Sequence, residues 1–345
     1  MKLRTGAICT LALSLAASPA LGGPTRQYVR ARLDVGYDSN LLDASDAERS
    51  AFASHDPNSF FVVNSMDDMF LDGELGAQWR LSHGGARPAL GLRYERKQYL
   101  RNPIRSENRF TLGSNVRPFS NTRLDLGLDY TPETYARHRA DVDALPGEPV
   151  FRAEVYRKTQ GDFQVTQSVS KATSIGLGAE GEFRDDKAPF DARDRWLAGG
   201  NLGVSQAIPG HLWIQGVGGY RRTWSRNEPG VPTDLSNREW FVRPALGGNL
   251  NPLRSTFKLE VELAWRDYTS PDPADANHFG RRDQRGELVF ELSRSIAGVG
   301  SETRLSHTWW SSNIPDATQD DNAYIDTEIR TGLVWTWDRA KKSEP

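Results

Sequence analysis

Residues 256 to 268 alternate between apolar and polar side chains with a period of two. The apolar members are Phe257, Leu259, Val261, Leu263 and Trp265, and between them stand Lys258, Glu260, Glu262, Ala264 and Arg266. Successive side chains of a β-strand point to opposite faces, whereas a helix would mix the two sets. We therefore expect a strand with one apolar and one charged face, which suits a sheet that separates lipid from water.

The same alternation recurs along the whole chain. It is equally regular at 28–37 and 122–130, and less regular versions cover 69–81, 88–99, 108–118, 151–167, 173–183, 195–206, 211–224, 238–250, 284–294, 300–311 and 322–337. These segments have the length, about ten residues or more, that a tilted membrane-spanning strand needs. The pattern predicts an all-β fold, an antiparallel transmembrane β-barrel of about 14 strands.

The predicted connections alternate in length. Short ones at 82–87, 119–121, 168–172, 207–210, 251–255 and 295–299 alternate with generally longer ones at 38–67, 100–107, 131–150, 184–194, 225–237, 268–283 and 312–321. Outer-membrane barrels have short periplasmic turns and longer external loops. The asymmetry favours such a barrel, with a periplasmic N-terminus, over a soluble β-sandwich. Pro209-Gly210 and Asn251-Pro252 in the short set are typical of hairpin turns.

Aromatic residues sort into two groups by their height along the predicted strands. Tyr37, Tyr94, Tyr130, Trp196, Tyr220, Trp240, Trp265, Tyr268 and Trp309 lie near the long connections, and Tyr28, Trp79, Trp213, Phe257, Trp335 and Trp337 lie near the short ones. Two levels of aromatic residues are typical of the girdles of membrane barrels. A mean hydropathy of −0.60 would equally suit a soluble exported β-protein, but an average conceals a period-two pattern.

The N-terminus has the features of a secretory signal peptide. Lys2 and Arg4 precede an apolar run at 7–17, and Ala20-Leu21-Gly22 supplies the small residues of a cleavage site. We expect a signal peptide at 1–22, the barrel at 23–337 and a polar C-terminal tail at 338–345. The one cysteine, Cys9, lies in the signal, so the mature chain has no thiol for a disulfide or a thiolate metal site.

Catalytic, metal and cofactor sites find little support in the sequence. Most of the six histidines lie in predicted loops or turns, whereas His307 lies inside a predicted strand, and no serine and carboxylate can be named to complete a hydrolase trio. The carboxylates at 271–275 and 316–321 lack the ordered spacing of a calcium loop. No helix follows Gly216-Val217-Gly218-Gly219 to present amides to a phosphate. We expect no catalytic, cofactor-binding or metal-binding residues.

The polar face of the predicted strands would line the barrel interior. The pore-lining candidates are Arg30, Arg32, Asp34, Glu74, Arg93, Glu95, Arg123, Asp125, Lys258, Glu260, Glu262, Arg266, Glu328 and Arg330. For each of them, pairing across strands to hold the wall rigid competes with a role in selectivity. A barrel of about 14 strands lies between small filled barrels and the 16-stranded porins that enclose a channel.

The long connection at 38–67 is the candidate for a plug. It contains the apolar stretch Phe60-Phe61-Val62-Val63. A lid folded into the barrel mouth would explain apolar residues in a loop, and an extension of the second membrane strand would explain them equally well.

The first predicted strand ends with Gly36-Tyr37-Asp38-Ser39-Asn40. This motif resembles the first strand of the C-terminal barrels of the surface lipoprotein assembly modifier family and of related exopolysaccharide-export barrels. The resemblance implies an export barrel. Members of that family usually carry tetratricopeptide repeats before the barrel, whereas here the barrel is expected to start within about ten residues of the cleavage site. Periplasmic handling of a substrate would then fall to a separate protein.

Two functions from different classes follow. The first is an outer-membrane channel or translocation pore of a Gram-negative bacterium, for passage or export of a polar substrate. The second is a structural or adhesive surface barrel that displays 131–150, 225–237 and 268–283, and a barrel enzyme is a weaker third. The expected partners are outer-membrane lipid and lipopolysaccharide, the barrel assembly machinery and separate periplasmic export components. A net charge of −2 gives no reason to expect nucleic acid.

Overall fold

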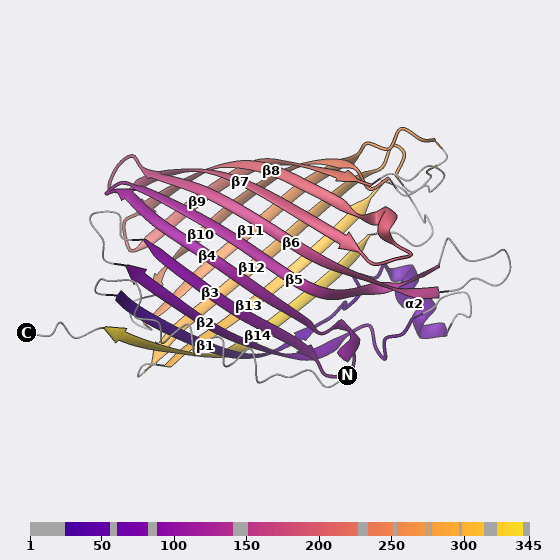
Figure 1. The fold of residues 1–345 in the computed structure, drawn as a ribbon, viewed down its shortest axis with the longest axis horizontal. Coiled ribbons are helices and arrows are strands. Elements are labelled where there is room, and N and C mark those ends of the chain that lie inside the picture. Colours follow the sequence, from indigo (N-terminus) through magenta and orange to yellow (C-terminus); the bar gives the residue numbers. More distant parts are fainter. Residues whose placement is uncertain are drawn as a thin grey trace, which may run out of the picture.

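A computed structural model describes residues 25–55, 61–81, 88–140, 151–226, 234–250, 254–273, 275, 278–296, 299–313 and 323–340. Within these residues, strands β1 to β14 form one closed antiparallel barrel (Figure 1). Each strand pairs with its neighbours in the sequence, and β1 closes the barrel on β14 from Arg26↔Ala340 to Asp38↔Glu328. The predicted fold class is confirmed.

The strands agree closely with the segments expected from the alternation. They are β1 (Thr25–Asp38), β2 (Asp68–Leu81), β3 (Ala89–Tyr99), β4 (Glu107–Phe119), β5 (Thr122–Ala140), β6 (Phe151–Ser168), β7 (Thr173–Asp186), β8 (Arg195–Ile208), β9 (Leu212–Ser225), β10 (Asn237–Leu250), β11 (Ser255–Tyr268), β12 (Arg282–Ile296), β13 (Val299–Ser312) and β14 (Tyr324–Ala340). The helical elements are α2 (Asp46–Ser54), η1 (Pro103–Arg105) and η2 (Asp191–Arg193). Among the described residues, no helix is both long and apolar enough to cross a membrane.

Apolar side chains face outward and charged side chains face inward. On β1, Leu33 is 54% exposed on the outer face, whereas its neighbour Asp34 is 3% exposed on the inner face. This distribution is the reverse of that in a soluble protein, where burial of apolar surface drives folding. The outer surface is therefore suited to contact with lipid chains.

Aromatic side chains form an outward belt near the long connections. Phe183 and Trp196 stack at 5.1 Å between ring centroids, and Tyr220 and Trp240 approach to 4.6 Å. The expected girdles were wrong for three residues, because their side chains lie on the lumen side: Tyr28, Trp213 and Tyr268. Height along a strand predicts the level of an aromatic residue, but the alternation decides which face it occupies.

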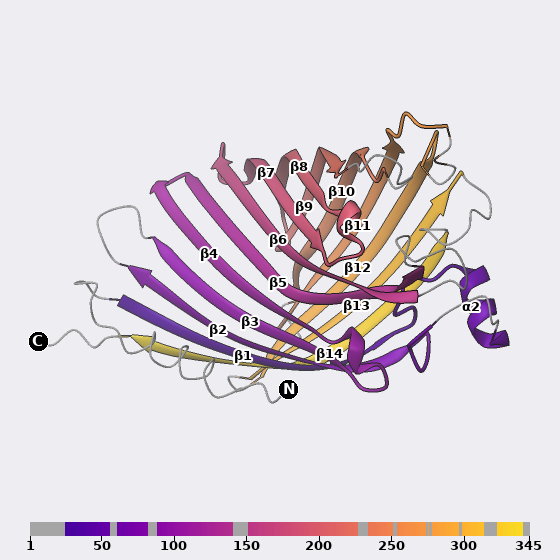
Figure 2. The same ribbon diagram turned by 45° about the vertical axis from the view of Figure 1, so that its right-hand side comes forward.

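The two ends of the barrel differ as the connection lengths predicted. The strand ends joined by the short connections share one end of the barrel with the start of β1 and the end of β14, and the strand ends joined by the long connections share the other end with α2 (Figure 2). The turn between β8 and β9 contains Pro209, Gly210 and His211, and Gly210 has a φ of +89°. That conformation favours glycine, which is the physical reason that Pro209-Gly210 predicts a hairpin turn.

Strand β5 is longer than predicted. Residues 131–140 were expected to belong to a long loop, but β5 continues through them to Ala140, with irregular pairing between Thr131 and Thr134 and between Tyr135 and His138. Tyr135 is buried in an apolar cluster at the barrel mouth. The prediction was wrong because the polar residues of this stretch are typical of a loop. The stretch is a strand whose Tyr135 is buried only through contacts with residues between 38 and 67.

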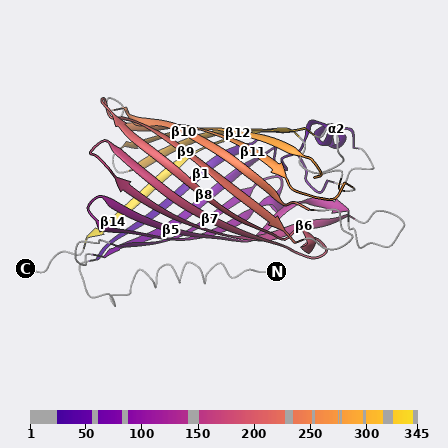
Figure 3. The same ribbon diagram turned by 90° about the horizontal axis from the view of Figure 1, so that it is seen from above.

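Residues 39–55 and 61–67, here called the mouth segment, fold back onto the barrel. The buried cluster contains Leu41, Leu42, Ala44, Val63, Met66, Phe70, Tyr99 and Tyr135, with Phe52, Phe61, Ala153 and Val155 packed against it. Strand β2 begins only at Asp68, so the mouth segment does not extend a membrane strand. The structure therefore favours the lid alternative. Helix α2 lies at the right-hand end of the barrel in Figure 3, and its Glu48 pairs with Arg137 of β5.

The local sequence determines where α2 begins. Ser45 accepts a hydrogen bond from the backbone N–H of Glu48, and the Glu48 carboxylate accepts one from the backbone N–H of Ser45. This capping box satisfies two donors that a helix start would otherwise leave unpaired. The helix ends at His55, whose φ of 54° is left-handed.

The Gly36-to-Asn40 motif connects β1 to the mouth segment. Gly36 leaves room for the ring of Phe70, since a Cβ there would lie 2.2 Å from the ring Cζ. Asp38 accepts a hydrogen bond of 2.6 Å from the Tyr99 hydroxyl. The Asn40 side chain both donates to and accepts from the backbone of Ala44 at 2.8 Å. The motif thus has a structural role in turning the chain from the wall into the mouth.

Several expectations fall outside the described residues. These are the signal peptide at 1–22, the turn at 82–87, the apolar residue Phe60, the acidic stretch at 316–321, and the parts 141–150 and 227–233 of the predicted loops at 131–150 and 225–237. At the C-terminus, β14 continues to Ala340, past the expected end of the barrel at Trp337.

The outward face can be tested with two adjacent residues of β8. Replacing the exposed, outward Leu202 by Arg should destabilise the barrel by about 2–4 kcal/mol, because a charge near the bilayer centre loses its hydration. Replacing its lumen-facing neighbour Asn201 by Arg should cost less than about 1 kcal/mol, because the lumen is polar. The measurement is urea unfolding in phospholipid vesicles, followed by tryptophan fluorescence. Equal losses for the two variants would contradict this assignment of the faces.

Candidate functional site in the barrel lumen

An ion-pair network centred on Arg32 covers the inner wall of β1 to β3. Arg32 lies 3.1 Å from carboxylate oxygens of both Asp34 and Asp72, 3.3 Å from Glu74 and 3.7 Å from Glu95. Asp72 is fully buried and also accepts from Arg330 of β14 at 3.1 Å. The register therefore brings together six residues that are far apart in the sequence, five of them predicted pore-lining candidates.

Two further pairs extend this network along the wall. Arg30 donates two hydrogen bonds to Glu302 of β13, at 2.9 and 3.0 Å, and lies 3.6 Å from Glu74. Lys97 of β3 donates to Glu328 of β14 at 2.7 Å. Arg30 and Glu328, both predicted candidates, thus hold partners that the sequence pattern had not assigned to them.

A second network covers the inner wall of β9 to β12. Arg266 donates to Glu239 at 2.7 Å, and Arg221 donates to the same carboxylate at 3.0 Å. Glu262 pairs with Arg243, and the Arg285 guanidinium lies 3.6 Å from it. Two other candidates pair along β11, since the Lys258 ammonium lies 2.9 Å from Glu260.

Sequence reasoning missed four members of the second network: Arg221, Glu239, Arg243 and Arg285. Their signal was present in the sequence. Glu239 and Arg243 alternate with the outward Trp240 and Val242, in the same way as the charged residues of β11 alternate with its apolar ones. Applying the alternation rule to β9, β10 and β12 as strictly as to β11 would have found them.

The inner wall of β3 to β5 is less densely paired. Arg123 donates to Asp125 at 2.7 and 2.9 Å. Arg93 donates one hydrogen bond, of 3.3 Å, to the Thr111 hydroxyl, which itself donates to Asp129. Within the described part of the chain, no carboxylate lies at ion-pair distance from Arg93. Arg93 therefore differs from the other arginines among the candidates.

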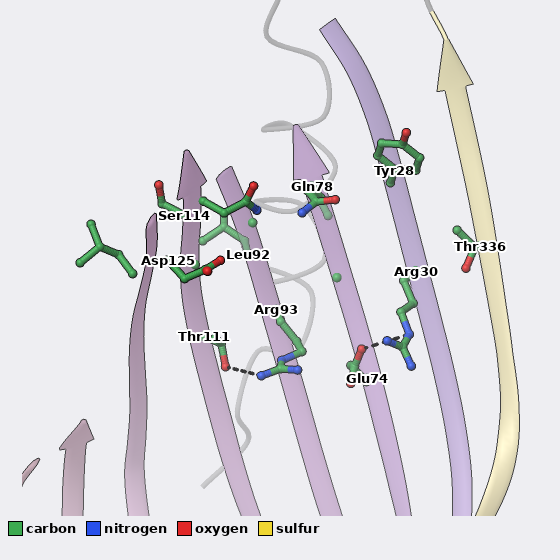
Figure 4. A pocket seen from close by; sticks show the side chains of 16 residues that line it. Tyr28, Arg30, Glu74, Gln78, Leu92, Arg93, Thr111, Ser114, Asp125 and Thr336 are labelled. Carbon is green, nitrogen blue, oxygen red and sulfur yellow. Dashed lines mark hydrogen bonds and ion pairs between the residues drawn. The ribbon is translucent and has the colours of Figure 1, made fainter. Parts of the chain in front are cut away.

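A recess of about 490 Å³ opens in the wall beside Arg93 (Figure 4). Its floor includes Gly76, Gly91 and Gly113, where an added Cβ would approach nothing closer than 3.5 Å. Arg30 and Arg93 stand on either side of it in the close-up view. The recess reflects the missing side chains of three neighbouring strands.

His307 lies on the outer face of the barrel. It alternates in step with the exposed Leu305 and Trp309, and its Nδ1 lies 2.9 Å from the Thr327 hydroxyl. A histidine on this face has no access to the lumen. Across the described ranges, no group of three His, Cys, Asp or Glu side chains is arranged to hold a metal ion.

The connection between β11 and β12 contains a buried histidine. His278 is 1% exposed, and its Nδ1 lies 2.8 Å from the Asp275 carboxylate. Its Nε2 is buried and has no hydrogen-bond partner among the residues that the structure describes. Burial lowers the pKa of His278 below its ordinary value, and the Asp275 carboxylate opposes this effect. The neutral imidazole, with Nδ1 donating to Asp275, fits this site.

Comparisons with known proteins identify similar barrels but no family. No family model matches the chain, and no curated protein matches it either. Similar solved structures include the anion-selective porin from Comamonas acidovorans, 8% identical, with a TM-score of 0.41 over 91% of this chain and 99% of that one. The outer-membrane channel DcaP of Acinetobacter baumannii is 8% identical, with a TM-score of 0.47 over 91% and 97%. A bacterial polysaccharide outer-membrane secretin is 8% identical, with a TM-score of 0.44 over 89% and 98%.

The buried network should be essential for stability. Replacing Asp72 by Ala should lower the free energy of unfolding by about 3–5 kcal/mol, because Arg32 and Arg330 would lose a shared, buried partner. Replacing Glu133 by Ala breaks the exposed pair with Lys187 and should cost less than about 1 kcal/mol. Urea unfolding of refolded protein gives both values. A loss for Asp72→Ala no larger than that for Glu133→Ala would show that the network is dispensable.

The loop that contains His278 should loosen in acid. Because its pKa is lowered in the folded state, the contribution of neutral His278 is complete above about 6.5, the ordinary value, and is lost as the pH falls from there through the lowered pKa. Limited proteolysis of the loop at 269–281 should therefore accelerate between pH 7.5 and pH 5, conditions set by the ordinary histidine pKa of about 6.5. In His278→Gln this added pH dependence should disappear, and its persistence would point to another titrating group.

Proposed function

We propose that the chain is an outer-membrane channel through which a polar solute passes. One observation carries the proposal: an apolar outer surface encloses a lumen whose walls carry charged side chains and a glycine-floored recess of about 490 Å³. Lipid would contact the outside, and a hydrated solute would contact the inside. In this proposal the barrel conducts a solute and does not catalyse a reaction.

The ion pairs of the lumen support a fixed and ordered wall. Arg32 and Arg266 each have carboxylate partners on neighbouring strands, so their guanidinium groups are held against the wall. Paired charges of both signs present a polar surface without a large net field along it. Such a surface favours passage of small polar molecules over tight binding of one ion, and we assign the pore-lining candidates this role.

The position of the mouth segment suggests a constriction of the proposed channel, at the end of the barrel opposite to the start of β1. Arg137 of β5 donates to the Glu48 carboxylate and to the Leu42 carbonyl oxygen, both at 2.9 Å. On the other side of the mouth, the Asn40 backbone N–H donates to Asp326 of β14 at 3.1 Å. Contacts from β14 to β6 thus hold the segment over part of the opening, where it would limit solute size.

The proposed orientation places the short connections in the periplasm and the mouth segment outside. This orientation agrees with the predicted signal peptide and with the usual asymmetry of outer-membrane barrels. The export role implied by the resemblance to lipoprotein-assembly and exopolysaccharide barrels is a narrower form of the same proposal. In that form, separate periplasmic components would deliver the substrate to the short-turn end.

A surface-display role is the second candidate, and the loop after β11 favours it. Two buried pairs lie among the described residues at this loop: Asp275 with His278, and Arg281 with Asp283 at 2.8 Å. The loop presents Phe279, which is half exposed, to the outside. A binding surface for an external partner would need such fixed contacts.

Conductance across planar bilayers separates the two candidates. Refolded protein should give a stable open current, and the Arg137→Ala variant should give a larger or noisier one, because the mouth segment loses its contacts with β5. Arg157→Ala, which breaks the exposed pair with Asp185, serves as the control and should leave the current unchanged. Silence of the wild-type protein across salts and voltages would sink the channel proposal and leave surface display.

A further inference from the structure

We infer that the recess beside Arg93 is a binding subsite for a hydroxylated carboxylate of about the size of a sugar acid. This inference rests on the proposed channel and names the class of solute that the channel selects. The recess has a volume of about 490 Å³, which is within the usual range of small-molecule sites, roughly 300–1,000 Å³. The site combines the Arg93 cation, neighbouring hydroxyl and amide groups, and a floor of glycines without side chains.

Arg93 supplies the charge that would bind a carboxylate. Its single hydrogen bond goes to a neutral hydroxyl at 3.3 Å, so the other guanidinium donors can turn toward the recess. A guanidinium presents two parallel N–H donors that match a carboxylate. Asp129 lies behind Thr111 and does not line the recess, so the hydroxyl separates it from Arg93.

The other charges of the recess already have partners. Glu74 lies 3.6 Å from Arg30 and 3.3 Å from Arg32, and Asp125 accepts from Arg123. Arg30 in turn is bound by Glu302 through both oxygens. Among the charged residues that line the recess, Arg93 is therefore the one without an ion-pair partner in the described part of the chain. This distribution favours an anion over a cation or an uncharged solute.

Uncharged polar groups surround the remaining space. Gln78, Thr111 and Thr336 line the recess and can each donate and accept hydrogen bonds (Figure 4). The Tyr28 hydroxyl, which accepts a hydrogen bond of 3.5 Å from Arg80, lies at one side. Hydroxyl groups of a ligand also donate and accept, so this mixed set suits a polyhydroxylated molecule.

The glycine floor provides the space for such a molecule. Gly91 and Gly113 are direct partners across β3 and β4, and Gly76 of β2 lies beside them opposite Arg93. The absence of side chains at these positions allows a ligand to reach the backbone of the wall. Beyond Gly113 the floor ends, because the Asp162 carboxylate covers Gly127, where a Cβ would lie 2.2 Å from Asp162 Oδ1.

Gluconate and glucose distinguish this site from a nonspecific polar lumen. In planar bilayers, gluconate added to the wild-type channel should reduce the ion current in a saturable way, and glucose should do so far less. In Arg93→Gln the concentration for half-block by gluconate should rise about tenfold or more, the effect of losing charge-assisted hydrogen bonds. Arg304→Gln removes a cation on β13, away from the recess, and should not change the block.

A second variant tests the floor without changing any charge. Gly91→Val places a side chain in open space, where the nearest atom lies 3.8 Å from the added Cβ, so the strand should still fold. The variant should conduct but lose the block by gluconate, because the side chain fills the recess. A channel blocked equally by gluconate and glucose, or unaffected by both Arg93→Gln and Gly91→Val, would overturn the inference while the channel stands.

Equilibrium binding tests the site even without conduction. Saturation-transfer NMR with detergent-folded full-length chain should show gluconate binding in the wild type and in Arg304→Gln, and a loss of binding in Arg93→Gln. No gluconate signal in the wild type would overturn the subsite. A gluconate signal from a barrel that carries no current would keep the subsite and overturn only the channel.

Discussion

The hydrogen bonds between β1 and β14 are the constraint on which the rest of this molecule depends. In the interior of a bilayer there is no water to bind exposed backbone N–H and C=O groups, so a sheet is stable there only if it has no edge. Pairing of β1 with β14 from Arg26 to Asp38 removes the last edge. Closure then defines an inside and an outside, and each strand must divide its side chains between them.

Closure makes the interior charges interdependent. Asp72 on β2 receives Arg32 from β1 and Arg330 from β14, so its environment spans the site of closure. A buried carboxylate is costly unless such partners surround it. Arg93, beside the glycine floor, has no carboxylate at ion-pair distance among the described residues. In the proposed channel, this ordered wall and the unpaired cation would together allow the barrel to select a solute.

The mouth segment depends on the same wall. Gly36 leaves space for the ring of Phe70, and the Tyr99 hydroxyl donates a hydrogen bond to Asp38. These contacts fix the direction in which the chain leaves the end of β1. Strand β5 continues beyond its expected end because the ring of Tyr135 is buried against the mouth segment. These contacts join residues nearly 100 positions apart in the chain, and no local pattern contains them.

The sequence by itself determined the strands, their faces and the end at which the long connections gather, because the alternation and the turn residues are local and follow from strand geometry. The candidates Arg32, Glu74 and Glu262 were placed on the inner face for the same reason. Only the tertiary structure decided which charges meet, that the segment at 38–67 folds into the mouth, and that Arg93 stands beside a recess. Strand register and barrel closure set these distances, and both depend on contacts between residues far apart in the chain.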